Sequence, residues 1–409
     1  MSKESENIIF LSNGYGEDTI ASAIMRELFK LRPGLPVMAF PLVGAGVQYK
    51  DLPVDLCGPR EVMPSEGMVP ESLGNLLDDI RGGLVSLTIK QLRELGRLRK
   101  KIRLCIAVGD LIPVMFSIIG LRKSPVFIGT AKSDYFVPYS WFERFILKRW
   151  CLLTLTRDQI TADSLGRYGI NAIWLGNAMM DALEFVGEDF RASGDILNLA
   201  LLPGSRGGVV DNFKFMLGVL DKIMSRNSMA IQGLVALAPS CRVDDFINAG
   251  LSSGWVEDRI EKNDHRLGKI SKDNHTILFL RGCFGDLLSS SDLILGQGGT
   301  ANEQAAGLQK PVVAFEPGGE ENLKWYRKRQ KGLLGEALIV VDKNEGLVAD
   351  KLLSLIASPE TREKMAKIGK ERMGPLGGSI RMARTILDIY DREVEKSAGK
   401  SRQNDRKRG

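Results

Sequence analysis

The chain has 409 residues, of which 44% are hydrophobic and 26% charged, and its formal net charge is +6. This is an ordinary soluble globular composition, and the length exceeds what one hydrophobic core usually serves, so we predict two domains. The cysteines are odd in number, widely scattered and form no CxxC pair, and only two histidines are present. These counts argue against a disulfide framework and a zinc cluster, and they favour a reducing, cytoplasmic compartment and no metal site.

The positive charge is concentrated in particular segments. Residues 396–409 contain six Lys/Arg against Asp405 alone, which predicts a disordered basic tail. Residues 81–103 hold eight Lys/Arg against one Glu, and residues 139–150 contain five aromatics among basic residues. Such segments are typical of contact with an anionic membrane surface, although a solvated helix face and a core helix explain them equally well. No nucleic-acid motif accompanies the charge, so we predict no nucleic-acid partner.

From the N-terminus, the chain alternates short apolar runs with helical patterns. MSKESEN leads straight into a strand without a signal-peptide pattern, and the longest apolar stretch, residues 104–120, is too short and interrupted to span a bilayer. The runs are apolar throughout, as in strands buried on both faces of a parallel sheet, which predicts two doubly wound α/β domains in tandem. The predicted strands are 8–11, 37–43, 104–108, 126–129, 152–156 and 172–176, then, after a polar break at 187–195, 197–203, 234–239, 276–280, 292–296, 311–315 and 337–341.

Ligands of open α/β sheets bind at the carboxyl ends of the strands, so the turns there are the candidate sites. In LSNGYGEDTIA (11–21), two glycines would let a ligand approach the backbone, and Glu17 and Asp18 open a helix. Acidic residues at a helix start are also ordinary complements of its dipole. In AVGDLIP (107–113), Asp110 ends an apolar strand, where it is either a general base or a helix cap.

Two turns in the second half of the chain have the composition of anion sites. LLPGSRGGVV (201–210) leaves a strand through Gly204, Ser205 and Arg206, which offer backbone N–H groups, a hydroxyl and a guanidinium near a helix start. A tight turn with an exposed arginine is the plainer interpretation. The second turn belongs to LGQGGTANEQAAGLQKPVV (295–313). It offers Gly296, Gln297, Gly298, Gly299 and Thr300 to a diphosphate, with Glu303 or Gln304 for ribose hydroxyls.

These two turns together resemble the lipid-A-disaccharide synthase family of glycosyltransferases. IWLGNAMMDAL (173–183) is similar to the segment that ends the family's N-terminal domain, and LSNGYGEDTIA has Ser12 and Asp18 in matching places. The resemblance covers roughly residues 7–390 and is strongest at 171–210 and 295–315. It implies a GT-B architecture, with two Rossmann-like doubly wound domains facing a central cleft. It also implies a donor in the C-terminal domain, an acceptor in the N-terminal one, and an inverting, metal-independent transfer.

The chain departs from the family pattern in its acidic motifs. The family's first loop reads SGExSGD where this chain has SNGYGED, and its acidic strand-end motif contains a second Asp where only Asp110 stands here. The family's ribose-binding Glu falls on Gln304, with Glu303 beside it. The acceptor therefore need not be lipid A.

We predict an acceptor-binding domain over 1–184, a nucleotide-sugar-binding domain over 185–372, and a helix over 373–395 that returns to the first domain. The predicted activity is transfer of a sugar, of N-acetylhexosamine type, from a UDP-sugar to a lipid or glycolipid acceptor at the cytoplasmic face of the inner membrane. The UDP-sugar is a substrate, and no further cofactor is predicted. Asp110, or else Asp18 or Glu17, would be the base. A UDP-N-acetylglucosamine 2-epimerase and a non-catalytic nucleotide-sugar-binding protein remain alternatives, whereas a dehydrogenase is disfavoured because no GxGxxG opens either domain.

Overall fold

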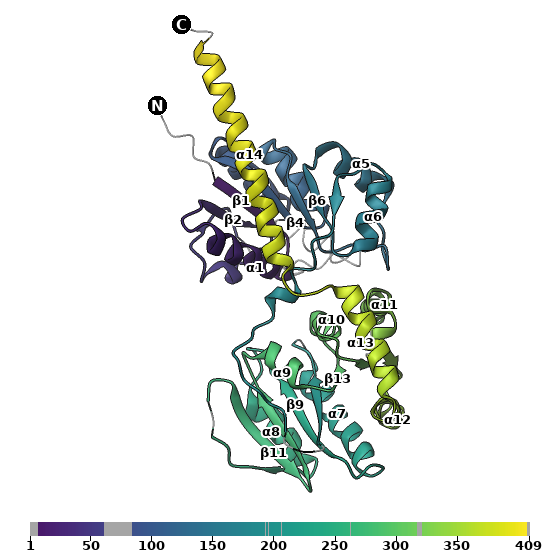
Figure 1. The fold of residues 1–409 in the computed structure, drawn as a ribbon. Helices are drawn as coiled ribbons and strands as arrows, with labels where there is room; N and C mark the ends of the chain where they lie inside the picture. The colour runs from purple at the N-terminus through teal and green to yellow at the C-terminus, as the bar shows by residue number, and fades with distance from the viewer. Residues whose placement is uncertain are drawn as a thin grey trace. The chain divides into compact units, whose positions relative to one another are not determined.

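The chain forms two compact units in the computed structural model, which describes residues 7–60, 84–192, 194, 196–205, 207–261, 263–316 and 321–406. The N-terminal unit consists of Met1–Ala182 and Leu376–Gly409, and the C-terminal unit of Leu183–Pro375. Each unit has its own sheet with helices on both faces (Figure 1). No helix among the described residues combines the length and apolar character needed to cross a membrane.

The N-terminal unit contains a seven-stranded sheet in the order β3-β2-β1-β4-β5-β6-β7, and every neighbouring pair is parallel. Its strands are β1 (Asn7–Ser12), β2 (Val37–Pro41), β3 (Asp55–Leu56), β4 (Ile102–Gly109), β5 (Val126–Gly129), β6 (Leu153–Leu155) and β7 (Ala172–Ile173). Its helices are α1 (Tyr15–Leu31), α3 (Leu84–Leu98), α4 (Leu111–Phe116), α5 (Trp141–Trp150), α6 (Gln159–Arg167) and α14 (Gly378–Arg406).

Burial on both faces explains the uniformly apolar strands of this unit. In β1, Ile8 and Phe10 pack into the cluster formed with α1 and α14. Ile9 and Leu11 point to the opposite face and pack into a second cluster that includes Leu95 of α3. Successive side chains of a strand alternate between faces, so a strand covered on both faces needs an unbroken apolar run.

The C-terminal unit contains an eight-stranded sheet in the order β10-β11-β12-β9-β8-β13-β14-β15. Its strands are β8 (Ile196–Leu202), β9 (Ala230–Ala236), β10 (Val256–Glu257), β11 (Arg266–Lys272), β12 (His275–Leu280), β13 (Leu293–Gly296), β14 (Val312–Phe315) and β15 (Leu338–Val341). Its helices are α7 (Val209–Met224), α8 (Val243–Ser252), α9 (Phe284–Ser290), α10 (Gly299–Gly307), α11 (Glu321–Leu334), α12 (Glu345–Ile356) and α13 (Pro359–Met373).

The sheet of the C-terminal unit differs from the sequence prediction at one edge. β10 pairs with β11 and β11 with β12 in antiparallel fashion, and neither β10 nor β11 was predicted. β11 has the sequence RLGKISK, in which a glycine and a lysine separate Leu267 from Ile270, so it lacks the uniform apolar run that marks the inner strands. The prediction of a doubly wound second domain is confirmed, and this antiparallel edge is an addition that the sequence did not indicate.

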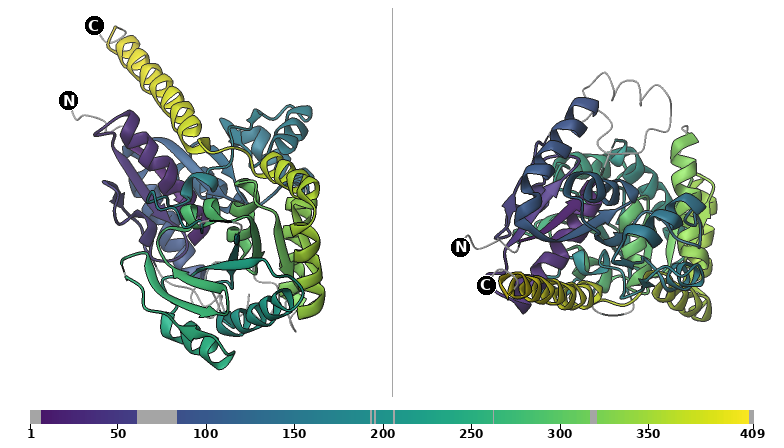
Figure 2. Two further views of the ribbon diagram at one scale, coloured as in Figure 1. Left: turned by 60° about the horizontal axis from the view of Figure 1, so that its bottom comes forward. Right: turned by 90° about the horizontal axis from the view of Figure 1, so that it is seen from above.

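The C-terminal helix α14 belongs to the N-terminal unit, where it packs along α1 (Figures 1 and 2). Arg32 at the end of α1 donates two hydrogen bonds of 2.7 Å to the two carboxylate oxygens of Asp391. The sequence predicted a disordered tail from residue 396, but α14 continues through Arg406. Lys, Arg and Gln are good helix formers and Gly399 is the one breaker in 396–406, which explains why the helix extends there.

Candidate functional site

Asp110 and Asn13 meet at the carboxyl edge of the N-terminal sheet. β1 and β4 are parallel neighbours, so the loops that follow them begin side by side. Asn13 Nδ2 donates a 2.7 Å hydrogen bond to Asp110 Oδ1, and the backbone N–H of Ile112 donates to the same oxygen over 2.8 Å. Asp110 is therefore the N-cap of α4, and among the described residues its Oδ2 accepts no hydrogen bond. Because the capping interaction uses only Oδ1, Asp110 Oδ2 remains able to accept a proton.

Burial raises the pKa of Asp110 above its ordinary value, and this effect outweighs the two hydrogen bonds, which lower it. The negative charge of nearby Glu17 raises the pKa further. A base becomes more effective as its pKa approaches the working pH, so this environment improves Asp110 as a proton acceptor.

Glycine at position 109 makes the contact between these loops possible. Gly109 has a φ of 132°, and a Cβ at this position would lie 1.9 Å from Asn13 Oδ1. A larger residue would thus be strained and would displace the Asn13 side chain from Asp110.

Glu17 lies at the same edge and contacts the end of a third strand. Thr130, which follows β5, donates its hydroxyl to Glu17 Oε1 over 2.9 Å. Glu17 is partly buried in the first turn of α1. The structure therefore brings two of the three predicted acidic residues, Asp110 and Glu17, to one edge.

Asp18, the third predicted acid, is fully buried beneath this edge. Ser12 Oγ donates to its Oδ1 over 2.6 Å, and the hydroxyl of Tyr49 donates to the same oxygen over 3.2 Å. Burial raises the pKa of Asp18 to about 6, against the lowering effect of these two hydroxyls. Its position inside the unit favours a role in holding the first loop over contact with a substrate.

In the C-terminal unit the two glycine-rich turns lie side by side, because β8 and β13 are parallel neighbours. The backbone N–H of Gln297 donates to the carbonyl of Leu202 over 2.8 Å and ties the turns together. Gly204 is partly buried and Ser205 is exposed, and Gly208 in the left-handed conformation caps α7. Arg206 lies outside the described residues, so its role stays a prediction.

The second turn opens α10 with Gly298 as its N-cap. The first N–H groups of a helix have no hydrogen-bond partner within that helix. In α10 these groups include the N–H groups of Gly299 and Thr300, and both residues are exposed. Asn302 holds the turn from below by donating to the carbonyl of Gly296 over 3.1 Å. A Cβ at position 296 would lie 2.0 Å from Asn302 Oδ1, which explains the glycine there. Glu303 and Gln304 are buried, at 5% and 8% exposure.

A buried group of polar side chains from α11, absent from the sequence prediction, supports this turn. Gln330 Nε2 donates to the carbonyls of Gly298 and Gly299 over 3.2 and 2.7 Å. Gln330 Oε1 accepts from Arg327 Nη1 over 2.7 Å, and Arg327 Nη2 donates to Gln297 Oε1 over 2.5 Å. Burial lowers the pKa of Arg327 to about 10, so it remains charged at neutral pH. The side chain of Gln297 is thus engaged within the protein.

The predicted aromatic surface of α5 is narrower than the sequence suggested. Trp141, Phe142 and Phe145 are 74%, 51% and 55% exposed. Ile146 of the same helix is buried, and Trp150, one of the five aromatics, is partly buried. A capping box of Ser140 and Glu143 starts the helix and fixes the position of these side chains.

Among the described residues, no group of three or more His, Cys, Asp or Glu side chains is arranged to hold a metal ion. Tyr49, Thr130, Arg327 and Gln330 were missed by the sequence reasoning. Thr130 directly follows a predicted strand, so the strand-end rule could have found it. Arg327 and Gln330 lie in a strongly basic stretch, ENLKWYRKRQKG, which resembles an exposed helix.

The comparisons with known proteins show the fold and one distant relative. No family model matches the chain. Lipid-A-disaccharide synthase of Syntrophus aciditrophicus (strain SB) is 25% identical over 206 residues, which are 47% of this chain and 46% of that protein, so the match spans under half of the relative's length.

Solved structures resemble nearly the whole chain, and two of them are given as examples. A UDP-glucosyltransferase from Polygonum tinctorium aligns with a TM-score of 0.55 at 10% identity, covering 96% of this chain and 100% of its own. A UDP-GlcNAc 2-epimerase from Neisseria meningitidis bound to UDP-GlcNAc aligns with a TM-score of 0.51 at 14% identity, covering 93% and 100%. The chain therefore has the GT-B fold of two Rossmann-like domains and is similar to lipid-A-disaccharide synthase.

Proposed function

We propose that the protein is a glycosyltransferase that moves a sugar from a UDP-sugar, bound by the C-terminal unit, to a lipid or glycolipid acceptor bound by the N-terminal unit. The observation that carries the proposal is the Asp110 carboxylate, which is partly buried at a strand end, has a raised pKa, and has one oxygen that accepts no hydrogen bond from the described part of the chain. The similarity to lipid-A-disaccharide synthase supports the choice of a transferase.

In the proposed reaction, Asp110 Oδ2 takes the proton from an acceptor hydroxyl. The oxygen of that hydroxyl attacks the anomeric carbon of the donor at the same time. The bond from the anomeric carbon to the diphosphate breaks, and the electron pair leaves with UDP. A single displacement of this kind inverts the anomeric centre. The Gly204–Ser205 and Gly298–Thr300 turns, with Arg206, would bind the diphosphate as its charge develops, so the transfer would need no metal.

The proposal is tested with the full chain, radiolabelled UDP-N-acetylglucosamine and a bacterial lipid extract. We expect label in the organic phase together with release of UDP. Epimerised donor without lipid labelling would identify a 2-epimerase, and donor binding without turnover would identify a binding protein. Either of these results would refute the transferase.

The donor site is tested through Arg206→Ala. We expect transfer to fall by about 10²–10³-fold, as when one donor to a developing anion is removed, while the melting temperature barely changes. Arg242→Ala, at an exposed position in the same unit, serves as the control. If Arg206→Ala transfers sugar as fast as wild type, Arg206 does not act on the donor, and the 203–208 segment is a tight turn with an exposed arginine.

Peripheral contact with an anionic membrane is part of the proposal, because an acylated acceptor lies in a bilayer. Exposed Trp141, Phe142 and Phe145 on α5 support it, since aromatic side chains favour the membrane interface. We expect binding to anionic vesicles at low salt and its loss at high salt, because each basic residue contributes about 1 kcal/mol within a Debye length. Trp141→Ser with Phe145→Ser should weaken binding severalfold, and absence of vesicle binding at low salt would make a soluble acceptor the better choice.

A further inference from the structure

The loop between β1 and α1 consists of Asn13 and Gly14 alone, and it carries a hydrogen bond to the proposed base. Asn13 Nδ2 donates to Asp110 Oδ1 over 2.7 Å. Asn13 Oδ1 is buried and accepts no hydrogen bond from the described residues. The contact with Asp110 and the course of the loop backbone therefore decide where the Asn13 amide lies.

Asp18, in the first turn of α1, closes this loop at both ends. Its backbone N–H donates to the carbonyl of Gly14 over 2.9 Å, and its Oδ1 accepts from Ser12 Oγ over 2.6 Å. The carbonyl of Ser12 accepts from the backbone N–H of Leu42 over 2.7 Å, which fixes this end of the loop to the sheet. The Asp18 carboxyl thus ties the start of α1 to a fixed point of the sheet, and Asn13 lies between the two.

Tyr49 holds the Asp18 carboxyl from a third element. It lies after β2 in a short 3₁₀ helix, Val47–Tyr49. Its hydroxyl is 2.8 Å from Ser12 Oγ and 3.2 Å from Asp18 Oδ1. Ser12, Asp18 and Tyr49 are at most 1% exposed, so they form a buried polar cluster beneath the acidic edge. Hydrogen bonds are stronger inside a protein than in water, so this cluster is suited to holding the loop in one conformation.

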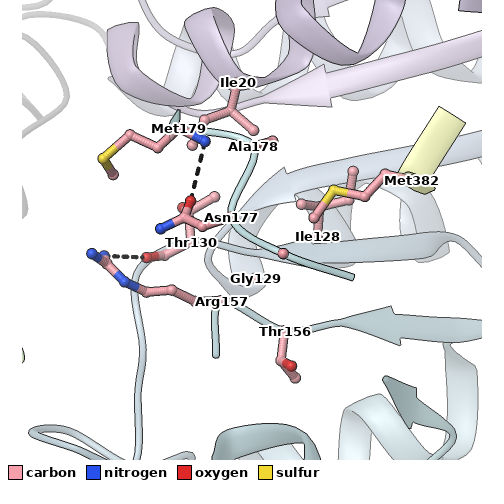
Figure 3. A pocket seen from close by; sticks show the side chains of 11 residues that line it. Ile20, Ile128, Gly129, Thr130, Thr156, Arg157, Asn177, Ala178, Met179 and Met382 are labelled. Atoms are coloured by element: carbon pink, nitrogen blue, oxygen red, sulfur yellow. Dashed lines mark hydrogen bonds between the residues drawn. The ribbon is translucent and has the colours of Figure 1, made fainter. Parts of the chain in front are cut away.

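Glu17, the neighbour of Asp18 in α1, has an anchor of its own. Its Oε1 accepts from the Thr130 hydroxyl over 2.9 Å. The carbonyl of Thr130 accepts in turn from Arg157 Nη1 over 3.2 Å, and Figure 3 shows this bond next to the end of β5. The position of Glu17 is thus set from the β5 side, whereas the position of Asn13 depends on the closed loop.

We infer that Asp18 is a positioning residue: by tying α1 to the sheet, its carboxyl holds Asn13 against Asp110 and so sets the orientation of the base. Its effect on catalysis rests on the proposed function, whereas its effect on the contact between Asn13 and Asp110 does not. A hydrogen bond to an ionised carboxylate lowers its pKa, so release of Asn13 would raise the pKa of Asp110. The charges of Glu17 and Glu143 also raise this pKa, and neither residue belongs to the loop.

The test is a pH titration of the Asp110 carboxyl in the full chain, measured by NMR of carboxyl-labelled aspartate and assigned through Asp110→Asn. Asp18→Ala removes the tie, and Ser12→Ala removes only the hydroxyl that Asp18 holds. Asp18→Asn keeps an oxygen that can accept from Ser12. Met25→Ala, at a fully buried position of α1 outside the cluster, is the control for loss of stability alone.

We expect Asp18→Ala and Ser12→Ala to raise the pKa of Asp110 by about half a pH unit or more, as the loss of one hydrogen bond to a carboxylate does. Asp18→Asn and Met25→Ala should leave this pKa at its wild-type value. Asn13→Ala should raise it as well, and adding Asp18→Ala to Asn13→Ala should have no further effect, because both changes act through one contact.

An unchanged pKa of Asp110 in Asp18→Ala would overturn the inference, as would an equal rise in Met25→Ala. If Asp18→Ala does not fold, Ser12→Ala decides in the same way. Additive effects of Asp18→Ala and Asn13→Ala would also overturn it, because Asp18 would then act on Asp110 by a route other than Asn13.

Sugar transfer gives the second readout. Asp18→Ala should lower kcat about tenfold or more at an unchanged KM for the donor, because a misplaced base takes the proton less often. The acid limb of its pH profile should move to higher pH with the pKa of Asp110. Asp18→Asn should keep kcat within about threefold of wild type, which the loss of a catalytic base would not allow.

The two readouts separate the positioning role from the proposed function. If the pKa of Asp110 responds as expected but the wild-type chain transfers no sugar, the proposed function fails and the positioning role stands. Normal transfer by Asp18→Ala together with an unchanged pKa of Asp110 would refute the positioning role alone.

Discussion

The two units present opposite chemistry at equivalent places in similar sheets. At the carboxyl edge of the N-terminal sheet, carboxylates of Asp110 and Glu17 are held by hydrogen bonds from Asn13 and Thr130. At the carboxyl edge of the C-terminal sheet, the glycine-rich turn at 296–300 is held by the Gln330 amide and by buried Arg327. The first edge is suited to accepting a proton and the second to binding an anion. The difference lies in a few residues after each strand, which shows that the shared fold alone does not decide what a strand end does.

The origin of the support also differs between the two edges. Asn13 and Thr130 lie directly after β1 and β5, so the acidic edge is held mainly by its own strand-end loops. Gln330 and Arg327 come from α11, which follows the turn they hold after one helix, α10, and one strand, β14. The acidic edge is therefore a local arrangement, whereas the turn at 296–300 depends on a helix packed beneath it.

The largest effect is expected from Asp110→Asn, which keeps the helix cap but removes the base. Transfer should fall by about 10²–10⁴-fold, the usual contribution of a general base, while UDP affinity stays unchanged because the donor turns lie in the other unit. The measurement is kcat for transfer together with calorimetric UDP binding. Asp163→Asn, an exposed residue of α6, is the matched control. Transfer within twofold of wild type would move the base to Glu17, which Glu17→Gln would then identify.

The next effect concerns stability and comes from Asp18, the buried carboxyl beneath the acidic edge. Its pKa is raised from 3.8 to about 6 by burial, so the folded state holds this proton more tightly than the unfolded chain does. The free energy of unfolding should therefore fall as pH rises from about 4 to about 6, by up to about 3 kcal/mol from this group, and stay lower above pH 6.

Asp18→Asn removes this ionisation, because an amide cannot lose the proton. Urea unfolding between pH 4 and pH 7 should show a flatter pH dependence than wild type and a higher free energy of unfolding at pH 7. Asp163→Asn should keep the wild-type slope. An Asp18→Asn variant with the full wild-type slope would mean that Asp18 is ionised in the folded protein throughout this range, and would restore it as a candidate base.

Most of the fold was predictable because both sheets bury two faces. Each inner strand then has to be a short apolar run, and the twelve predicted runs all correspond to strands, although the run at 234–239 is displaced relative to β9. The missed strands are two of two residues each, β3 and β10, and the polar strand β11. These lie at sheet edges or next to them, where fewer neighbours impose an apolar pattern.

The candidate site was predictable where function depends on the residue next to a strand end. Asp110 and Glu17 were found in this way, and Thr130 follows a strand in the same manner but carried no motif. Asp18 was grouped with them because sequence position does not show that its side chain turns inward toward Ser12 and Tyr49. The support of the second turn by α11 was not predictable, since it joins segments about thirty residues apart through buried amides in a basic stretch.

The smallest effect is expected from Gln330→Leu, which tests whether the turn at 296–300 depends on α11. Leucine leaves the carbonyls of Gly298 and Gly299, and the Arg327 guanidinium, without the hydrogen bonds that Gln330 provides. UDP affinity should fall about tenfold, which is 1.4 kcal/mol, because a turn that has lost its support must be ordered when the diphosphate binds.

Gln330→Glu keeps the acceptor for Arg327 but loses the donor to the carbonyls, so it should recover most of the melting temperature without recovering UDP affinity. Lys328→Met, on the exposed side of α11, is the control for changes to that helix. If Gln330→Leu and Gln330→Glu both bind UDP within twofold of wild type, the turn keeps its shape without α11, and the two edges of the molecule are supported in the same local way.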